Sequence, residues 1–180
     1  KGTLIDKLVL MLDKYGRLKD WDVSWIIDMS DWFNCPDDYL TGRDFGSMSK
    51  KQIREEYFNF DVSEWDVSSV ECFDRMFKNC FLYNNDMNKW NTESATSMNQ
   101  MFLSCIDFNQ NLENWNVENV KDMSFMFKKC FKFNQPLNEW NVENVERMDH
   151  MFAFCKTKFN QPLNKWNVGN VKDMSFMFFN

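Results

Sequence analysis

Cysteine is the residue type in this chain whose spacing could support chemistry. Four cysteines recur at 25-residue steps, and two others, Cys35 and Cys72, do not belong to this series. The four are Cys80, Cys105, Cys130 and Cys155. One interpretation is that they are buried, reduced thiols, since Cys is among the most buried residue types. Another is that they form disulfides between neighbouring copies of a repeat. A metal site is disfavoured, because the chain has no C-x-x-C pair and one histidine.

That histidine, His150, does not indicate catalysis. Equivalent positions of the other copies hold Arg75, Gln100, Phe125 and Phe176, so nothing in this column requires an imidazole. A Ser–His–Asp or Cys–His arrangement would depend on this one residue. The few glycines are scattered and form no phosphate-binding loop. We therefore expect a protein that is not an enzyme and has no cofactor.

The cysteines belong to a longer repeat, which tryptophan marks most clearly. Its spacings are 25, 25, 25 and 26 residues, at Trp65, Trp90, Trp115, Trp140 and Trp166. A fixed period in this range is typical of stacked repeats. A methionine and a phenylalanine follow each tryptophan at a fixed distance, as in Met101–Phe102, Met126–Phe127 and Met151–Phe152. We expect these residues to form one continuous core.

Each copy predicts a short strand, a turn and a short helix. Residues 137–142 indicate a short extended segment, in which Trp140 and Val142 have the period of two that sends side chains to one face of a strand. Residues 145–152 have apolar side chains at three- and four-residue steps, as on one face of a helix. Asn144 stands where an N-cap would. The expected fold is an α/β repeat solenoid whose coils of 25 or 26 residues stack on one another.

The chain divides into four parts on this basis. Residues 1–20 predict an N-terminal capping helix, because they combine a capping box, an apolar stripe and a glycine stop. Residues 21–35 form a first coil, since "WDVSWIIDMSDWF" matches "WDVSSVECFDRMF" of the next copy. A polar insertion spans residues 36–57. Stacked repeats occupy residues 58–180, the last of them incomplete.

Asparagine recurs in two columns, one after the aromatic residue that opens each copy and one after each tryptophan. The first column holds Asn84, Asn109, Asn134 and Asn160, and the second Asn91, Asn116, Asn141 and Asn167. A ligand site spread along such a ladder is one interpretation. The alternative is that stacked amides satisfy backbone groups in tight turns, and we favour it.

The columns that vary offer the candidate partner-binding surface. One is acidic over three consecutive copies, at Glu93, Glu118 and Glu143. Together with a net charge of −6, this argues against nucleic acid and permits a basic protein partner. The same acids could instead keep an aromatic-rich chain soluble. The longest apolar run, "LVLML" at residues 8–12, is too short to span a bilayer.

One family shares these motifs. "YGRLKDWDVSWIIDMSDWF", followed by copies of "FNQPLNxWNVxNVxxMxxMF", resembles the BspA-like surface-protein repeats, which occur also in mycoplasma lipoproteins and in some giant viruses. The resemblance covers almost the whole chain except the insertion. It implies a leucine-rich-repeat-like solenoid at a cell or virion surface, with a role in adhesion or protein binding. Reduced cysteines would instead suit an intracellular origin.

Two functional classes follow from the repeat and from this resemblance. In the first, the solenoid surface binds another protein of unknown identity, as an interaction or adhesion module. In the second, the chain is a structural component packed permanently in a larger assembly, such as a surface layer or a virion shell.

Overall fold

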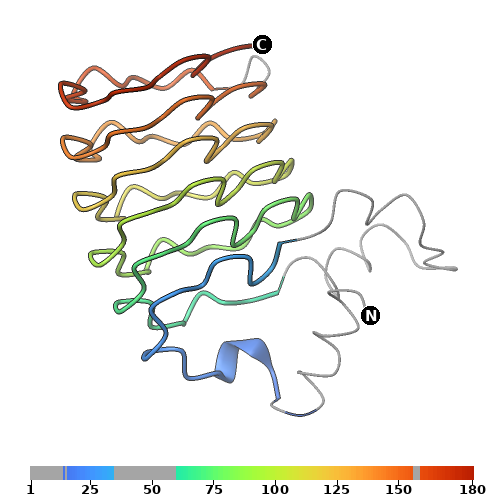
Figure 1. The fold of residues 1–180 in the computed structure, drawn as a ribbon. Coiled ribbons are helices and arrows are strands. Elements are labelled where there is room, and N and C mark those ends of the chain that lie inside the picture. The colour runs from blue at the N-terminus through green and yellow to red at the C-terminus, as the bar shows by residue number, and fades with distance from the viewer. Residues whose placement is uncertain (1–13, 15, 35–59, 156–158) are drawn as a thin grey trace, which may run out of the picture.

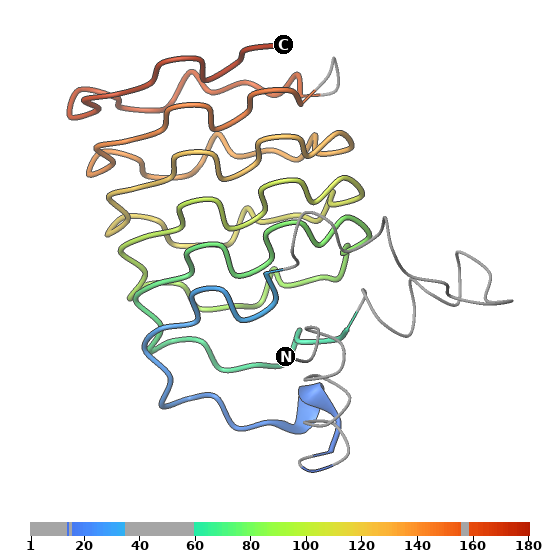
Figure 2. The same ribbon diagram turned by 45° about the vertical axis from the view of Figure 1, so that its right-hand side comes forward.

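The chain winds into a stack of similar coils. The computed structural model describes residues 14, 16–34, 60–155 and 159–180. Within them the coils follow one another from the blue N-terminal end to the red C-terminal end (Figures 1 and 2). The described residues contain one complete helical element, the 3-10 helix η1 (Leu18–Asp20). Isolated parallel bridges join successive coils at Asp28–Cys72, Cys72–Ser97, Ser97–Asp122, Asp122–Arg147 and Arg147–Asp173.

The expected α/β solenoid of strand–turn–helix coils is wrong. Residues 145–152 form no helix, because alternate amides bond to the next coil and not to a carbonyl four residues earlier: the Met148 amide donates to the Asp173 carbonyl at 2.9 Å. His150 has a φ of 57°, a left-handed conformation that a right-handed helix cannot contain. Residues 137–142 form no strand either. The parallel bridge of this coil lies at Arg147, within the expected helix.

The expected N-terminal capping helix is part of the same error. Of the described residues among 1–20, Lys14 has an α-helical conformation and Leu18–Asp20 form the three-residue helix η1, which Trp21 follows in an extended conformation. The remaining residues of that segment, 1–13 and 15, lie outside the described residues, as does the polar insertion 36–57.

Tight turns, not helices, account for the three-residue spacing of the apolar side chains. In the fourth coil the Trp115 amide donates to the Leu112 carbonyl at 3.0 Å, and Val120 repeats this bond to Val117. The same bond to the carbonyl three residues earlier recurs from Met126 to Met123 and from Cys130 to Phe127. Each apolar pair therefore opens and closes a turn, and both of its side chains face the interior of the coil.

Hydrogen bonds between coils hold the stack together. The Gln100 amide donates to the Ser124 carbonyl at 3.0 Å, and the Phe102 amide donates to Met126 at 3.0 Å. The intervening residue, Met101, instead closes a turn within its own coil. Alternate amides thus pair with the next coil, as between parallel strands.

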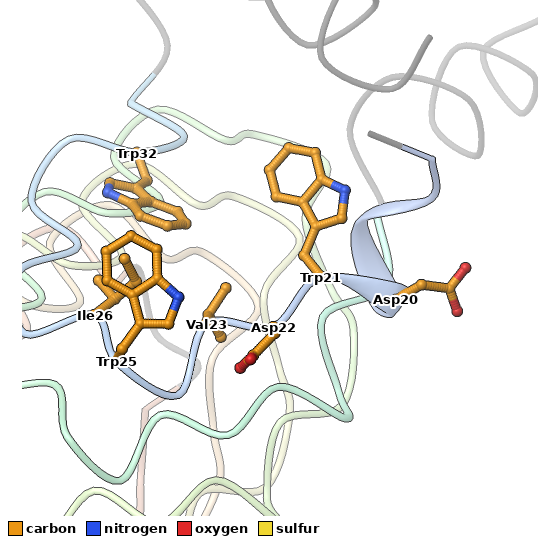
Figure 3. A pocket seen from close by; sticks show the side chains of 7 residues that line it. All are labelled: Asp20, Trp21, Asp22, Val23, Trp25, Ile26 and Trp32. Carbon is orange, nitrogen blue, oxygen red and sulfur yellow. The ribbon is translucent and has the colours of Figure 1, made fainter. Parts of the chain in front are cut away.

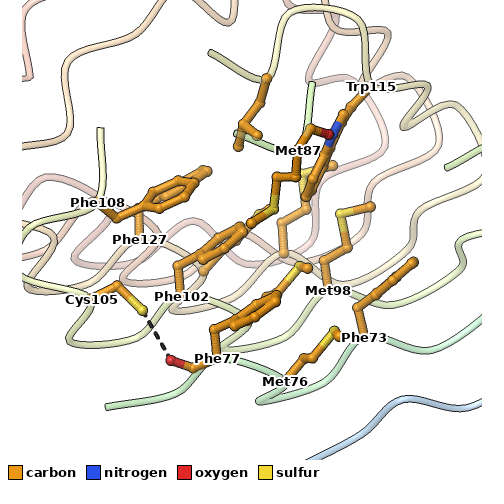
Figure 4. Close-up of a cluster of buried hydrophobic side chains, with 14 of the residues drawn as sticks. Phe73, Met76, Phe77, Met87, Met98, Phe102, Cys105, Phe108, Trp115 and Phe127 are labelled. Carbon is orange, nitrogen blue, oxygen red and sulfur yellow. Dashed lines mark hydrogen bonds between the residues drawn. The ribbon is translucent and has the colours of Figure 1, made fainter. Parts of the chain in front are cut away.

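Aromatic rings fill the interior in columns (Figure 4). Phe102 stacks on Phe77 and on Phe127 with centroids 5.7 Å apart in both cases, and on Phe108 of its own coil at 4.2 Å. The methionine and phenylalanine columns expected in the core are buried at Met101, Met126, Met151, Phe102, Phe127 and Phe152. These columns give the stack one continuous apolar core.

The tryptophans also bond to the backbone of the preceding coil. Trp90 and Trp115 stack at 6.0 Å with their planes 3° apart. The Trp115 indole N–H donates to the Met87 carbonyl at 2.9 Å. The same bond is made by Trp65, Trp90, Trp140 and Trp166. Trp65, Trp90, Trp115 and Trp140 are buried, whereas Trp166 of the last coil is partly exposed. A phenylalanine could not make this bond, so the column requires tryptophan.

One buried hydroxyl in this core has no hydrogen-bond partner. Tyr83 is fully buried and stacks on Phe77 at 4.4 Å, in a column whose other members include Phe108 and Phe133. Its hydroxyl makes no hydrogen bond to any residue that the structure describes. Burial raises the pKa of Tyr83 well above its ordinary range, so the phenol stays neutral. A buried polar group without a partner costs stability.

Removing this hydroxyl should therefore not destabilise the fold. We expect Tyr83→Phe to raise the free energy of unfolding by about 1 kcal/mol, because the ring stack is kept and the unpaired group is lost. The mirror change, Phe108→Tyr, should lower it by about 1–3 kcal/mol. Urea denaturation of both variants measures the two effects. A loss of stability in Tyr83→Phe would show that the hydroxyl has a partner.

Candidate interaction surface

Glu93, Glu118 and Glu143 are exposed at equivalent positions of three neighbouring coils, and are named here the acidic row. Two asparagine bonds fix the backbone of each member. At Glu118, the amide donates to the Asn116 side chain at 3.0 Å, and the carbonyl accepts from the Asn144 side chain at 3.0 Å. Glu93 and Glu143 have the same two bonds. The backbone is therefore held in place while the carboxylates remain in solvent.

Charges in two other columns are compensated between coils. Lys89 pairs with Glu64 at 2.9 Å, and Lys165 pairs with Glu139 at 2.6 Å. Lys172 pairs with Glu146, and its ammonium lowers the pKa of that carboxyl. The acidic row has no such ion pair within the part of the chain that the structure describes. Like charges about 4.8 Å apart repel one another, so this line has an uncompensated negative potential.

The asparagine columns stabilise the stack. The Asn109 amide donates to the Asn84 side chain at 2.8 Å, and the Asn134 amide donates to Asn109 at 2.9 Å. The column after tryptophan closes turns, as Asn116 does for Glu118. Asn144, expected as a helix N-cap, instead bonds to the carbonyl of the preceding coil. Each of these side chains therefore satisfies backbone groups that the turns leave unpaired.

The columnar cysteines are buried thiols, and none of them forms a disulfide with another described residue. The Cys105 thiol donates to the Phe77 carbonyl, 28 residues earlier, at 3.0 Å (Figure 4). Cys80, Cys130 and Cys155 make the equivalent bond at the same distance. Burial raises the pKa of Cys130 well above its ordinary range and that of Cys155 to about 12. Such thiols stay protonated at neutral pH and are poor nucleophiles.

His150 lies in an aromatic stack on the surface. Its ring is 4.6 Å from Phe125 and 5.0 Å from Phe176, between centroids. Its Nδ1 is 3.5 Å from the Asp149 carboxylate and makes no hydrogen bond. Among the described residues, no group of three or more His, Cys, Asp or Glu side chains could hold a metal ion. No helix in the described ranges is long and apolar enough to cross a membrane.

A cavity in the first coil is the feature that the sequence did not predict. It has a volume of about 590 Å3 and is lined mainly by Trp21, Trp25, Ile26 and Trp32, with Asp20 and Asp22 also lining it (Figure 3). Figure 3 shows Trp21 across the cavity from Trp25 and Trp32. A signal was present in the repeat. Trp25 aligns with a serine or an asparagine in every later coil, and Trp32 aligns with methionine.

The burial of the cysteines generates a labelling prediction. We expect a bulky thiol reagent to modify the partly exposed Cys72 in native protein, and to leave Cys105 and Cys130 unmodified until the chain unfolds. Mass spectrometry of peptides at successive times gives the rate at each site, and protein in denaturant gives the intrinsic rates. Rapid native modification of Cys105 or Cys130 would contradict the buried column.

The comparisons with known proteins identify a family. Residues 10–102, 45–158 and 112–180 each match the family described as Mycoplasma protein of unknown function, DUF285. No match was found among the curated proteins or the solved structures. The three matches overlap and together extend from residue 10 to residue 180. The chain therefore belongs to the DUF285 family of Mycoplasma repeat proteins.

Proposed function

We propose that the chain is a non-enzymatic repeat scaffold that binds a basic protein partner through the acidic row. Its repeats resemble those of the BspA-like surface proteins, for which adhesion or protein binding is the expected role. Membership of DUF285 and the Asn- and Trp-rich repeat support that relation. In this role the core columns serve to hold a long, regular surface.

The observation that carries the proposal is the contrast between columns. Glu64 and Glu139 each have a lysine of the next coil as partner. The acidic row places three carboxylates in line without one, on a backbone that asparagine bonds hold. A line of repelling charges is relieved when a cationic surface covers it, so it favours association with a basic partner.

Charge reversal tests the row. We expect the triple change Glu93→Lys, Glu118→Lys and Glu143→Lys to leave the thermal melt nearly unchanged, because all three side chains are exposed. Binding of an oligolysine peptide at low ionic strength should weaken about tenfold or more. Isothermal titration calorimetry at two salt concentrations measures this loss, which high salt should reduce.

A matched comparison separates the row from net charge. One double variant changes two members of the row, Glu118→Lys with Glu143→Lys. The control double variant, Glu71→Lys with Glu113→Lys, changes two exposed acids outside the row and alters the net charge by the same amount. The first pair should weaken binding more than the second. Equal effects from both pairs would show that the peptide responds to overall charge and that the row is not a binding surface.

A further inference from the structure

The first coil contains more tryptophan than any other. Of the eight tryptophans in the chain, three lie in this coil, at Trp21, Trp25 and Trp32, and each later coil has one. Trp32 contributes to packing, since its ring meets Trp65 edge-on at 5.8 Å. Trp21 donates its indole N–H to Gly16 at 3.2 Å. Trp25 is different, because 73% of its surface is exposed.

Nothing in the repeat explains a tryptophan at this position. In the later coils the same column holds Ser69, Ser94, Asn119, Asn144 and Asn170. Asn119, for example, donates to the Glu93 carbonyl of the preceding coil, which is a structural task that an indole of the first coil does not perform. A large exposed aromatic side chain next to a cavity marks a contact site for a partner.

The charge at the cavity is negative. Asp22 accepts hydrogen bonds from the Ser24 hydroxyl at 2.7 Å and the Ser24 amide at 3.1 Å, and these lower its pKa. Asp22 has no ion pair among the described residues, whereas Asp20 pairs with Arg17 at 2.9 Å. Asp66, the next member of the Asp22 column, lies on the neighbouring coil and does not line the cavity. A carboxylate that keeps its charge therefore lines the same cavity as three indoles.

We propose that this cavity binds an arginine side chain of the basic partner, with the guanidinium stacked on an indole and hydrogen-bonded to Asp22. A guanidinium is planar, stacks on aromatic faces and donates in a fixed fork to carboxylates. The described residues already contain contacts between a cation and an aromatic ring, since the Lys128 ammonium lies 4.8 Å from the Phe125 ring centroid and 5.7 Å from that of Phe154. This inference rests on the proposed function and names the chemistry of its partner.

The repeat itself supplies variants that preserve the fold. Asp22→Asn removes the charge and keeps the turn, because Asn116 closes the same turn in a later coil. Asp66→Asn is the matched control, since Asp66 makes the same bond to Ser68 one coil away. Trp25→Ser restores the residue type that Ser69 and Ser94 have in this column.

The test is a titration of the 180-residue chain with a short arginine–glycine peptide. The control ligand is the same peptide with citrulline in place of arginine, which is uncharged but similar in shape. We expect the arginine peptide to shift the indole N–H resonances of Trp25 and Trp32 in NMR spectra and the citrulline peptide to leave them unchanged. Trp25→Ser should weaken binding about tenfold, and Asp22→Asn severalfold.

The arms of the experiment separate this inference from the proposed function. Asp66→Asn and the reversal of the acidic row should leave the Trp25 shift in place, because neither changes the cavity. If the arginine peptide leaves the Trp25 resonance unmoved, or if Trp25→Ser and Asp66→Asn have equal effects, the cavity is not an arginine site. In that case the acidic row can still bind the peptide. The triple lysine variant of the row tests this separately, because it leaves the cavity unchanged.

Discussion

The sharing of backbone hydrogen bonds between coils is the constraint on which this structure depends. The Phe102 amide donates to Met126, and the Phe127 amide to Met151, so each coil satisfies polar groups of its neighbour. Such bonds form only if the bonded segments of successive coils have the same shape and register, since an unpaired buried amide is costly. The indole and thiol bonds, as from Trp115 to Met87 and from Cys105 to Phe77, depend on the same register. This requirement explains why the same core residues, such as the tryptophan and the methionine–phenylalanine pair, recur in successive coils.

Positions that no neighbour constrains are those left for recognition. The side chains of the acidic row are such positions, because the asparagine bonds at Glu118 use its backbone and leave its carboxylate in solvent. The first coil also contains a position that departs from the repeat. Trp25 departs from its column and lines an aromatic cavity. Two carboxylates line this cavity. Asp20 pairs with Arg17, whereas Asp22 has no ion pair among the described residues. The two surfaces share a negative charge, which suits a single basic partner.

The sequence predicts the repeat well and its secondary structure poorly. The three-residue step of Met123 and Met126 identifies inward-facing side chains in either architecture, because a helix face and a pair of turn ends share that spacing. What it does not reveal is the left-handed backbone at Gln100, Phe125 and His150, where glycine would be the usual signal. The acidic row could be found by reading down a column. The only sign of the cavity in the sequence is that Trp25 and Trp32 depart from their columns, which does not show that their side chains line one space.

The central claim is that alternate amides bond to the next coil and not within a helix. NMR scalar couplings across hydrogen bonds test it directly, because they identify the carbonyl that each amide contacts. The account predicts a coupling between the Phe102 amide nitrogen and the Met126 carbonyl carbon. A coupling from Phe102 to Met98, four residues earlier as in an α-helix, would contradict it.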